Sequence, residues 1–278
     1  MSDPVVSIIM PVYNAENHLV ESIESILNQI FHDFELIILN DGSTDNSESI
    51  ITSFLDVRIH TENRKHGFIA SLNAGLEKAR GKYIARMDAD DIMLPDRLSV
   101  QVAFMEKHPE IAVCGSFAEY FGNLNRIVNV EKKHFKILLT MFTSNPLINP
   151  TTIIRRSALG MNRYVNSYPY AEDYKLWTDL VLQGQKFANI PQVLLRYRVS
   201  SSQVSSACRS QMDQSSKMIQ LEFAEMIMDK VLDQNPDYLD RYNYLVKLTN
   251  EGYISYKIFL NKVRNLYIAL KSENSNWQ

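Results

Sequence analysis

Residues 82–91 read Lys82-Tyr83-Ile84-Ala85-Arg86-Met87-Asp88-Ala89-Asp90-Asp91, an apolar run with strand character that ends directly in three carboxylates. Successive residues of an extended chain face opposite ways, so we expect Asp88 and Asp90 to project together and Asp91 to point away. Carboxylates this close repel one another unless a cation lies between them, and such hard oxygen ligands suit Mg²⁺ or Mn²⁺. The stretch therefore predicts a metal site formed by Asp90 and Asp88, although an Asp-rich turn by itself is equally typical of a solvated loop.

The chain before this stretch alternates between short apolar runs and helical patterns. Strands are predicted over residues 5–10, 34–39, 57–61 and 82–87, with helical spacing of apolar residues between them. Pro11 is expected to end the first strand, because proline cannot donate to a ladder, and Asn14 is expected to cap the helix that follows. Strand and helix alternation of this regularity is typical of a parallel, doubly wound α/β sheet.

The pattern after the carboxylates is less regular and then becomes helical. Helices are predicted over residues 96–108 and 172–183, and strands over residues 111–116, 151–155 and 193–199. From about residue 203 onward the apolar positions recur at helical spacing. We therefore predict a mostly parallel α/β domain over residues 1–202 and a helical C-terminal region, residues 203–278, that packs on it.

Composition narrows the class of protein. The chain has 278 residues, of which 45% are hydrophobic and 22% charged, and its formal net charge is −3. This charge does not favour a nucleic-acid partner. Cys114 and Cys208 show no spacing typical of a disulfide framework or a zinc site. The start of the chain has no signal-peptide pattern, and no apolar run approaches the ~18 residues of a membrane span, so we expect a cytoplasmic protein, soluble or peripheral at the membrane.

Two further strand ends are expected beside the carboxylates. Pro11 and Tyr13 follow the first predicted strand, and Asp41 follows the second, at the same edge of the sheet as Asp88. A tyrosine ring can stack on a planar base, and a carboxylate can accept a hydrogen bond from a ring imide, which favours uracil or thymine over adenine. Each residue alone is also typical of structure, Tyr13 as a core aromatic and Asp41 as a turn residue.

Six short motifs follow one another along the chain: Pro11-Val12-Tyr13-Asn14, Asn40-Asp41-Gly42-Ser43-Thr44-Asp45, Leu72-Asn73-Ala74-Gly75, Ala79-Arg80-Gly81-Lys82-Tyr83-Ile84, Asp88-Ala89-Asp90-Asp91 and Glu172-Asp173. In this order and spacing, over roughly residues 5–200, the chain resembles the family 2 glycosyltransferases, which have the GT-A fold. The resemblance implies inverting transfer of a sugar from a nucleotide-sugar to an acceptor hydroxyl. It also implies a role in building a bacterial surface glycan such as lipooligosaccharide, capsule or O-antigen.

The resemblance assigns roles to the residues at the strand ends. It places the nucleotide base at Asp41 with Tyr13 and Pro11 beside it, Asp88 near the ribose and diphosphate, and Asp90 on a Mn²⁺ or Mg²⁺ ion.

The resemblance also makes Asp173 the general base and Glu172 its capping or acceptor-binding neighbour. Inversion by single displacement needs one carboxylate to take the acceptor's proton, while a metal stabilises the departing diphosphate. Without the resemblance, both side chains would be typical of acidic residues in the first turn of a helix.

The chain departs from the family pattern in two places. Ser200 stands where the family often has a histidine that touches the metal or diphosphate, and Lys65 stands where an asparagine is usual. Arg64 is a candidate cation for the phosphates, and Arg198, on the strand before Ser200, is a candidate contact to donor or acceptor. Exposed basic side chains are equally typical of solvated surface.

These observations predict a metal-dependent hexosyl- or N-acetylhexosaminyltransferase that uses a UDP-sugar, or less favourably a dTDP-sugar. Its expected acceptor is a glycan or lipid-linked glycan, reached by peripheral association with the inner face of the membrane. The alternatives are a degenerate relative that binds nucleotide or glycan without turnover, and a nucleotidyltransferase on a similar sheet. A dinucleotide dehydrogenase is disfavoured because no G-x-G-x-x-G follows the first strand.

Overall fold

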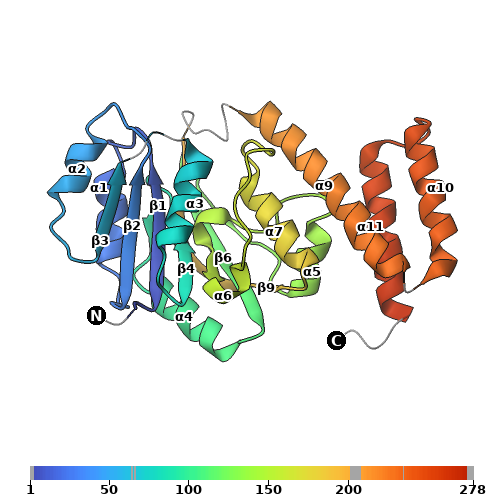
Figure 1. Ribbon diagram of the computed structural model, residues 1–278, viewed down its shortest axis with the longest axis horizontal. Helices are drawn as coiled ribbons and strands as arrows, with labels where there is room; N and C mark the ends of the chain where they lie inside the picture. The colour runs from blue at the N-terminus through green and yellow to red at the C-terminus, as the bar shows by residue number, and fades with distance from the viewer. Residues whose placement is uncertain (1–2, 64, 66, 201–207, 234, 274–278) are drawn as a thin grey trace.

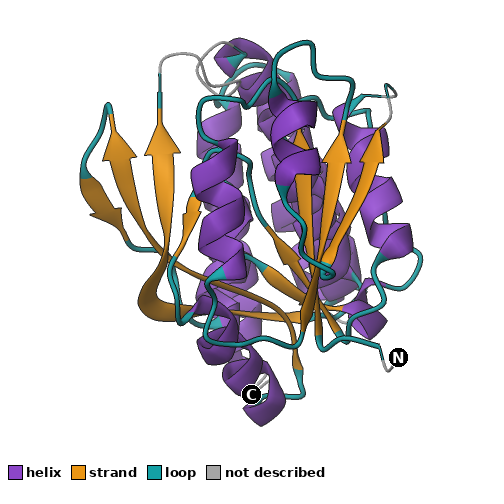
Figure 2. Ribbon diagram, turned by 90° about the vertical axis from the view of Figure 1, so that its left-hand side faces the viewer, coloured by secondary structure: helices purple, strands orange, loops and turns teal. Residues whose placement is uncertain are grey.

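The computed structural model describes residues 3–63, 65, 67–200, 208–233 and 235–273. Within these residues the chain forms one nine-stranded sheet with the order β3-β2-β1-β4-β8-β6-β9-β5, and β7 pairs with β6 outside that path. Figure 2 shows the strands with helices packed against them. The three C-terminal helices lie at the end of the molecule remote from β1, β2 and β3 (Figure 1).

The first half of the sheet is parallel, as the sequence predicts. Its strands are β1 (Val6–Val12), β2 (Phe34–Asn40), β3 (Ile59–Asn63) and β4 (Tyr83–Arg86). The helices between them are α1 (Leu19–Leu27), α2 (Ser47–Ser53) and α3 (Phe68–Lys78). Every residue of β1 and β2 is buried, which explains why these strands read as continuous apolar runs rather than as alternating ones.

Two local expectations in this half are wrong. Pro11 does not end β1, because the strand continues to Val12. At Pro11 β1 pairs only with β2, since its pairing with β4 stops at Ile9, so the missing N–H disturbs no second ladder. Asn14 does not cap α1, which begins at Leu19, and instead adopts a left-handed backbone with φ of 48°.

The second half of the sheet is mixed. β8 (Ile153–Arg155) runs antiparallel between β4 and β6 (Ile111–Gly122), and the long β9 (Lys186–Val199) runs parallel to β6. The short strands β5 (Ile92–Met93) and β7 (Arg126–Val128) pair antiparallel with β9 and β6. The remaining elements are α4 (Arg97–Lys107), α5 (His134–Thr140), the 3₁₀ turn η1 (Asn149–Thr151), α6 (Arg156–Leu159) and α7 (Glu172–Leu182). The predicted fold class, a mostly parallel α/β sheet, is confirmed.

The C-terminal region is helical, as expected, with α9 (Arg209–Leu232), the 3₁₀ turn η2 (Pro236–Tyr238), α10 (Leu239–Asn250) and α11 (Tyr256–Glu273). Phe223 on α9 is 1% exposed and meets Phe142 edge-on at 5.1 Å between ring centroids. One buried apolar cluster joins α7 to α9 and α11. The helices therefore share a core with the sheet domain, while the predicted boundary between residues 202 and 203 lies outside the described residues.

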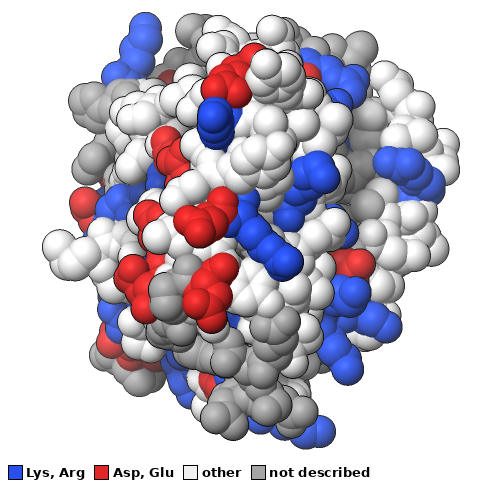
Figure 3. Space-filling model, turned by 90° about the vertical axis from the view of Figure 1, so that its right-hand side faces the viewer, with Lys and Arg blue, Asp and Glu red and all other residues white. Residues whose placement is uncertain are grey.

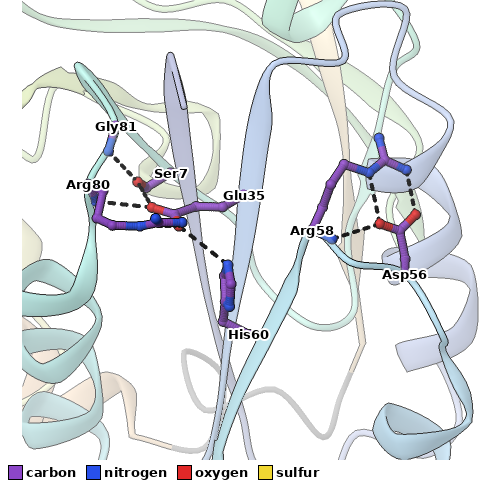
Figure 4. Close-up of polar contacts among 7 residues, drawn as sticks. All are labelled: Ser7, Glu35, Asp56, Arg58, His60, Arg80 and Gly81. Atoms are coloured by element: carbon purple, nitrogen blue, oxygen red, sulfur yellow. Dashed lines mark hydrogen bonds and ion pairs between the residues drawn. The ribbon is translucent and has the colours of Figure 1, made fainter. Parts of the chain in front are cut away.

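A buried polar cluster ties the strands together at the opposite edge of the sheet from the predicted metal site (Figure 4). Glu35 on β2 accepts hydrogen bonds from the Ser7 hydroxyl at 2.6 Å and from the backbone and guanidinium of Arg80. His60 on β3 lies 3.5 Å from the same carboxylate. Glu35 thus joins β1, β2, β3 and the turn before β4 by hydrogen bonds to a charged group.

Candidate functional site

The carboxyl ends of β1, β2 and β4 meet at one edge of the sheet, as the sequence predicts. Val12 pairs with Asn40, and the backbone N–H of Asp41 donates to the carbonyl oxygen of Val12 at 2.9 Å. β4 joins the other side of β1, where Arg86 pairs with Ile9. The turns that carry Tyr13, Asp41 and Asp88 therefore emerge from neighbouring strands.

Tyr13 projects from the end of β1 into solvent. Its side chain is 64% exposed, so it is not a core aromatic, and an open ring face can stack on a planar ligand. The next residue, Asn14, joins this turn to the turn after β2: its N–H donates to the Ser43 hydroxyl at 3.0 Å, and its Oδ1 accepts from the Thr44 N–H at 2.8 Å. Asn tolerates left-handed backbone better than most residues, which lets the chain turn sharply after Tyr13. Pro11 is buried within β1 and can shape this turn only through the backbone.

Asp41 connects the turn after β2 to the start of α3. Its Oδ1 accepts a hydrogen bond from the Gly67 N–H at 2.9 Å, and Gly67 has a φ of 91° that favours glycine. The neighbouring Asn40, not Asp41, closes the local turn by accepting from the Ser43 N–H at 3.1 Å. Asp41 is thus placed beside Tyr13 on two joined turns. Arg64 lies outside the described residues.

The predicted metal-binding carboxylates lie in a turn rather than in an extended strand. β4 ends at Arg86, and the Asp91 N–H approaches the Asp88 carbonyl oxygen at 3.5 Å across the turn. The side chain of Asp91 still differs from the other two as expected: Asp91 is fully buried, whereas Asp88 and Asp90 are partly exposed. Burial, with the charges of Asp88 and Asp90, raises the pKa of Asp91 well above its ordinary value.

Arg198 braces this turn from β9. Its backbone N–H donates to Oδ1 of Asp91 at 2.8 Å, and its Nε donates to the carbonyl oxygen of Asp90 at 2.8 Å. The end of the guanidinium pairs with Glu21 on α1 at 2.5 Å. These contacts of Arg198 hold the turn in place, and β9 ends at Val199, directly before Ser200.

Arg86, which sequence reasoning treated only as a strand residue, is the buried cation of the site. Its side chain is 4% exposed, and Nη2 lies 2.6 Å from Oδ1 of Asp88. The guanidinium lies over the Phe68 ring at 5.8 Å from its centroid. Its charge also opposes the rise in the pKa values of Glu172 and Asp173. A charged residue directly before an acidic turn was the signal that could have found it.

Glu172 and Asp173 form a buried acidic pair at the start of α7, with 8% and 9% of their surfaces exposed. Burial and the charge of Asp173 raise the pKa of Glu172 to about 7. Burial also raises the pKa of Asp173, opposed by hydrogen bonds from the side chain of Asn145 and the backbone of Tyr174, whereas the charge of Asp88 raises it further. A raised carboxylate pKa suits a group that must take up a proton.

The residues at the acidic turn fit a Mg²⁺ or Mn²⁺ ion that is shared with a substrate. Among the residues that the structure describes, no group of three or more His, Cys, Asp or Glu side chains is arranged to hold a metal by itself. Mg²⁺ in phosphate-transfer sites is commonly held by only one or two carboxylates, with substrate phosphates and waters completing the shell. Two partly exposed carboxylates, Asp88 and Asp90, are the residues of this turn that would hold such an ion.

Comparison with known proteins assigns the family. The model of glycosyl transferase family 2 matches residues 7–166, more than half of the chain. The chain belongs to this family. It is thus a glycosyltransferase, and the GT-A fold predicted from its motifs is the fold observed.

Two curated relatives support the assignment. An uncharacterized glycosyltransferase of Haemophilus influenzae is 37% identical over 245 residues, which cover 82% of this chain and 76% of the relative. WfgD of Escherichia coli, a UDP-Glc:alpha-D-GlcNAc-diphosphoundecaprenol beta-1,3-glucosyltransferase, is 33% identical over 209 residues, or 74% of this chain and 81% of WfgD.

Two solved structures share the fold. TarS of S. aureus, crystallised as residues 1–349 with UDP-GlcNAc, has a TM-score of 0.65 at 20% identity and covers 80% of this chain. This chain spans 66% of that TarS structure. The mannosyltransferase PcManGT of Pyrobaculum calidifontis, in complex with GDP-Man and Mn²⁺, has a TM-score of 0.58 at 15% identity, over 99% of this chain and 88% of its own.

Proposed function

We propose that the protein is a metal-dependent, inverting glycosyltransferase that moves a sugar from a UDP-sugar to a hydroxyl of a growing surface glycan. One observation carries the proposal: the charge of Asp88 raises the pKa of the buried acid Asp173, which supports placing the proposed base and the proposed metal-binding turn at one site. Inversion needs both in one place, because the acceptor is deprotonated while the diphosphate departs.

The donor is proposed from the base pocket and from the relatives. Tyr13 offers an exposed ring and Asp41 a carboxylate on the neighbouring turn, a pair that matches the ring face and imide N–H of uracil. WfgD uses UDP-Glc by its name, and TarS was crystallised with UDP-GlcNAc. A UDP-hexose or UDP-N-acetylhexosamine therefore fits better than a dTDP-sugar.

The chemical step assigned to the chain's own residues is a proton transfer. As the acceptor oxygen forms its bond to the anomeric carbon, the bond from that carbon to the diphosphate oxygen breaks, and the acceptor's proton passes to Asp173. The diphosphate leaves with the bonding electron pair. A divalent cation at Asp90 and Asp88, when bound, neutralises charge on this leaving group. Glu172 is proposed to bind the acceptor beside the base.

The acceptor is proposed to be a glycan or lipid-linked glycan, reached by peripheral association with the inner face of the membrane. Among the described residues, no helix combines the length and apolar character that crossing a bilayer requires. Figure 3 shows acidic and basic side chains interspersed over the face formed by the C-terminal helices. Tyr244 and Tyr253 in this region are 61% and 74% exposed, and aromatic side chains of this kind suit a membrane interface.

A donor screen tests the proposal. Thermal shift with Mn²⁺ across UDP-Gal, UDP-Glc, UDP-GlcNAc, UDP-GalNAc and dTDP-sugars should identify one UDP-sugar, from which the protein then releases UDP. Asp90→Ala should abolish the metal-dependent part of the shift. Asp173→Asn should keep the shift and lower UDP release by about 10²–10⁴-fold, the usual contribution of a general base.

Three results would contradict it. Normal turnover by Asp173→Asn would remove the base assignment. Metal-dependent donor binding by the unaltered protein without hydrolysis or transfer to any acceptor would favour a degenerate, non-catalytic relative. Transfer of a nucleotidyl group, detected as release of a sugar phosphate or pyrophosphate, would favour a nucleotidyltransferase.

A further inference from the structure

A side chain from a distant loop holds the candidate base. Asn145 lies between α5 and η1, and its Nδ2 donates a hydrogen bond of 2.8 Å to Oδ2 of Asp173. The two residues are 28 positions apart in the chain. A hydrogen bond to a buried carboxylate is among the stronger interactions that a neutral amide makes.

The direction of the Asn145 amide is set by its own loop. Its Oδ1 accepts a hydrogen bond from the backbone N–H of Leu147 at 3.3 Å, the pattern of an Asx turn. With the oxygen engaged there, the NH₂ end must face Asp173, so the donor is assigned by the network. Pro146 restricts the backbone of Asn145 to extended conformations, which limits the positions open to the side chain.

The same loop is attached to α7 at a second point. The hydroxyl of Tyr174 donates to the carbonyl oxygen of Met141 at 2.5 Å. Pro146, Leu147 and Ile148 are buried, and Leu147 belongs to the core cluster that contains Tyr174. The loop and the first turn of α7 therefore pack as one unit, which keeps the Asn145 donor in place.

The contacts leave the carboxylate able to act. The backbone N–H of Tyr174 donates to Oδ1 of Asp173 at 2.7 Å, so each oxygen accepts one hydrogen bond within the protein. An ionised carboxylate has about four acceptor positions. The two contacts thus fix the plane of the group and leave capacity on each oxygen for an acceptor hydroxyl.

We propose that Asn145 is a positioning residue that orients the Asp173 carboxylate toward the acceptor. This inference rests on the proposed function of Asp173 as general base. The loop before η1 then takes part in catalysis through the base. In other enzymes, too, the base is oriented by a third group.

The electrostatics of Asp173 give the inference a distinctive signature. The hydrogen bond from Asn145 opposes the rise that burial causes in the pKa of Asp173. The charged or titratable groups that also act with Asp173 are Arg86, Asp88, Glu172, Tyr164 and Tyr174. Losing the Asn145 donor should raise the pKa of Asp173 further. Because a base must be ionised to act, the acid limb of the kcat/KM profile should move to higher pH.

Asn145→Asp is the decisive variant, because it keeps an oxygen that can accept from the Leu147 N–H and replaces the amide donor by a carboxylate, whose charge also repels Asp173. We expect kcat for UDP release to fall roughly ten- to a hundredfold near pH 7, with donor KM within about twofold of the unaltered protein. The acid limb should move to higher pH, and binding of UDP with Mn²⁺ by thermal shift should be unchanged. If Asn145→Asp does not fold, Asn145→Ala carries the same expectations.

Tyr174→Phe is the matched control, since it removes the other attachment of the loop and leaves the Asn145 contact. It should lower the melting temperature without moving the acid limb. An acid limb and kcat for the Asn145 variants within twofold of the unaltered protein would overturn the inference, as would a Tyr174→Phe profile shifted equally. Asp173→Asn separates the two ideas: if it is inactive while Asn145→Asp is normal, only the role of Asn145 fails.

Discussion

The pKa values of two buried glutamates, Glu35 on β2 and Glu172 at the start of α7, are shifted in opposite directions. Glu35 and Glu172 are 3% and 8% exposed. Burial raises the pKa of Glu35, but hydrogen bonds from Ser7 and Arg80 outweigh it and leave the pKa below its ordinary value. Burial and a neighbouring acid raise the pKa of Glu172 to about 7. Similar burial thus has opposite outcomes for the pKa, because the neighbouring groups of the two carboxylates differ.

The arginines of the two clusters differ in the same way. Arg80, beside Glu35, has a side chain that is 49% exposed, whereas the side chain of Arg86 is 4% exposed. Arg80 pairs with Glu35, which also accepts its hydrogen bonds. Arg86 pairs with Asp88 and also acts on two acids of α7. A single buried charge therefore connects the proposed metal turn to the proposed base.

Among variants of these two arginines and two glutamates, the largest effect is expected for Arg86→Met. Loss of this cation should reduce UDP release about ten- to a hundredfold at pH 7, because the pKa values of Glu172 and Asp173 would rise and less of the base would be ionised. The full pH profile of kcat/KM measures this, and its acid limb should move to higher pH. Arg80→Met is the control, which should lower the melting temperature and leave the profile unchanged. If Arg86→Met and Arg80→Met lost activity equally, both arginines would act through the stability of the protein alone.

Glu35→Gln is expected to have the next largest effect, on stability rather than activity. Losing the charged acceptor should lower the free energy of unfolding by about 1–3 kcal/mol at pH 7, as measured by urea denaturation. Since folding lowers the pKa of Glu35, its contribution is present above the unfolded value and is lost as pH falls through the folded value. The difference between variant and unaltered protein should therefore shrink in acid.

Asp56→Asn supplies the matched control for this carboxylate. Asp56 pairs with Arg58 at 2.7 Å, but both side chains are about a quarter exposed (Figure 4). An exposed pair of this kind contributes ~0.5 kcal/mol or less. If Asp56→Asn cost as much as Glu35→Gln, the buried cluster would have no special role.

Glu172→Gln should have a smaller effect on stability than Glu35→Gln, with the opposite sign. Folding raises the pKa of Glu172, so the folded state binds more protons than the unfolded one between the ordinary value and about 7, and stability falls as pH rises through that window. The variant should not show this loss. Its free energy of unfolding, relative to that of the unaltered protein, should therefore be higher above pH 7 than at pH 5 by on the order of 1 kcal/mol. Melting temperatures at the two pH values measure it, and a variant that melts lower at pH 8 would contradict it.

The strand ends were predictable from the sequence because their signals are local. Continuous apolar runs and the acidic residues after them place Tyr13, Asp41 and Asp88 at one edge, since parallel strands carry their carboxyl ends together. The antiparallel direction of β8 was not predictable, because a three-residue strand carries no mark of its direction. The length of β1 was not predictable from the sequence. Pro11 is tolerated in the strand because β4 does not pair with β1 at this position.

By itself the sequence determined the family, the parallel half of the sheet and the acidic residues from which a metal site and a base can be chosen. Those properties follow from periodicity and from motifs whose members are close in the chain. Only the tertiary structure decided which acids are ionised easily and what orients them, because Arg86, Asn145 and Arg198 act across tens of residues. Burial and partner charge set a pKa, and both depend on which distant segments pack together.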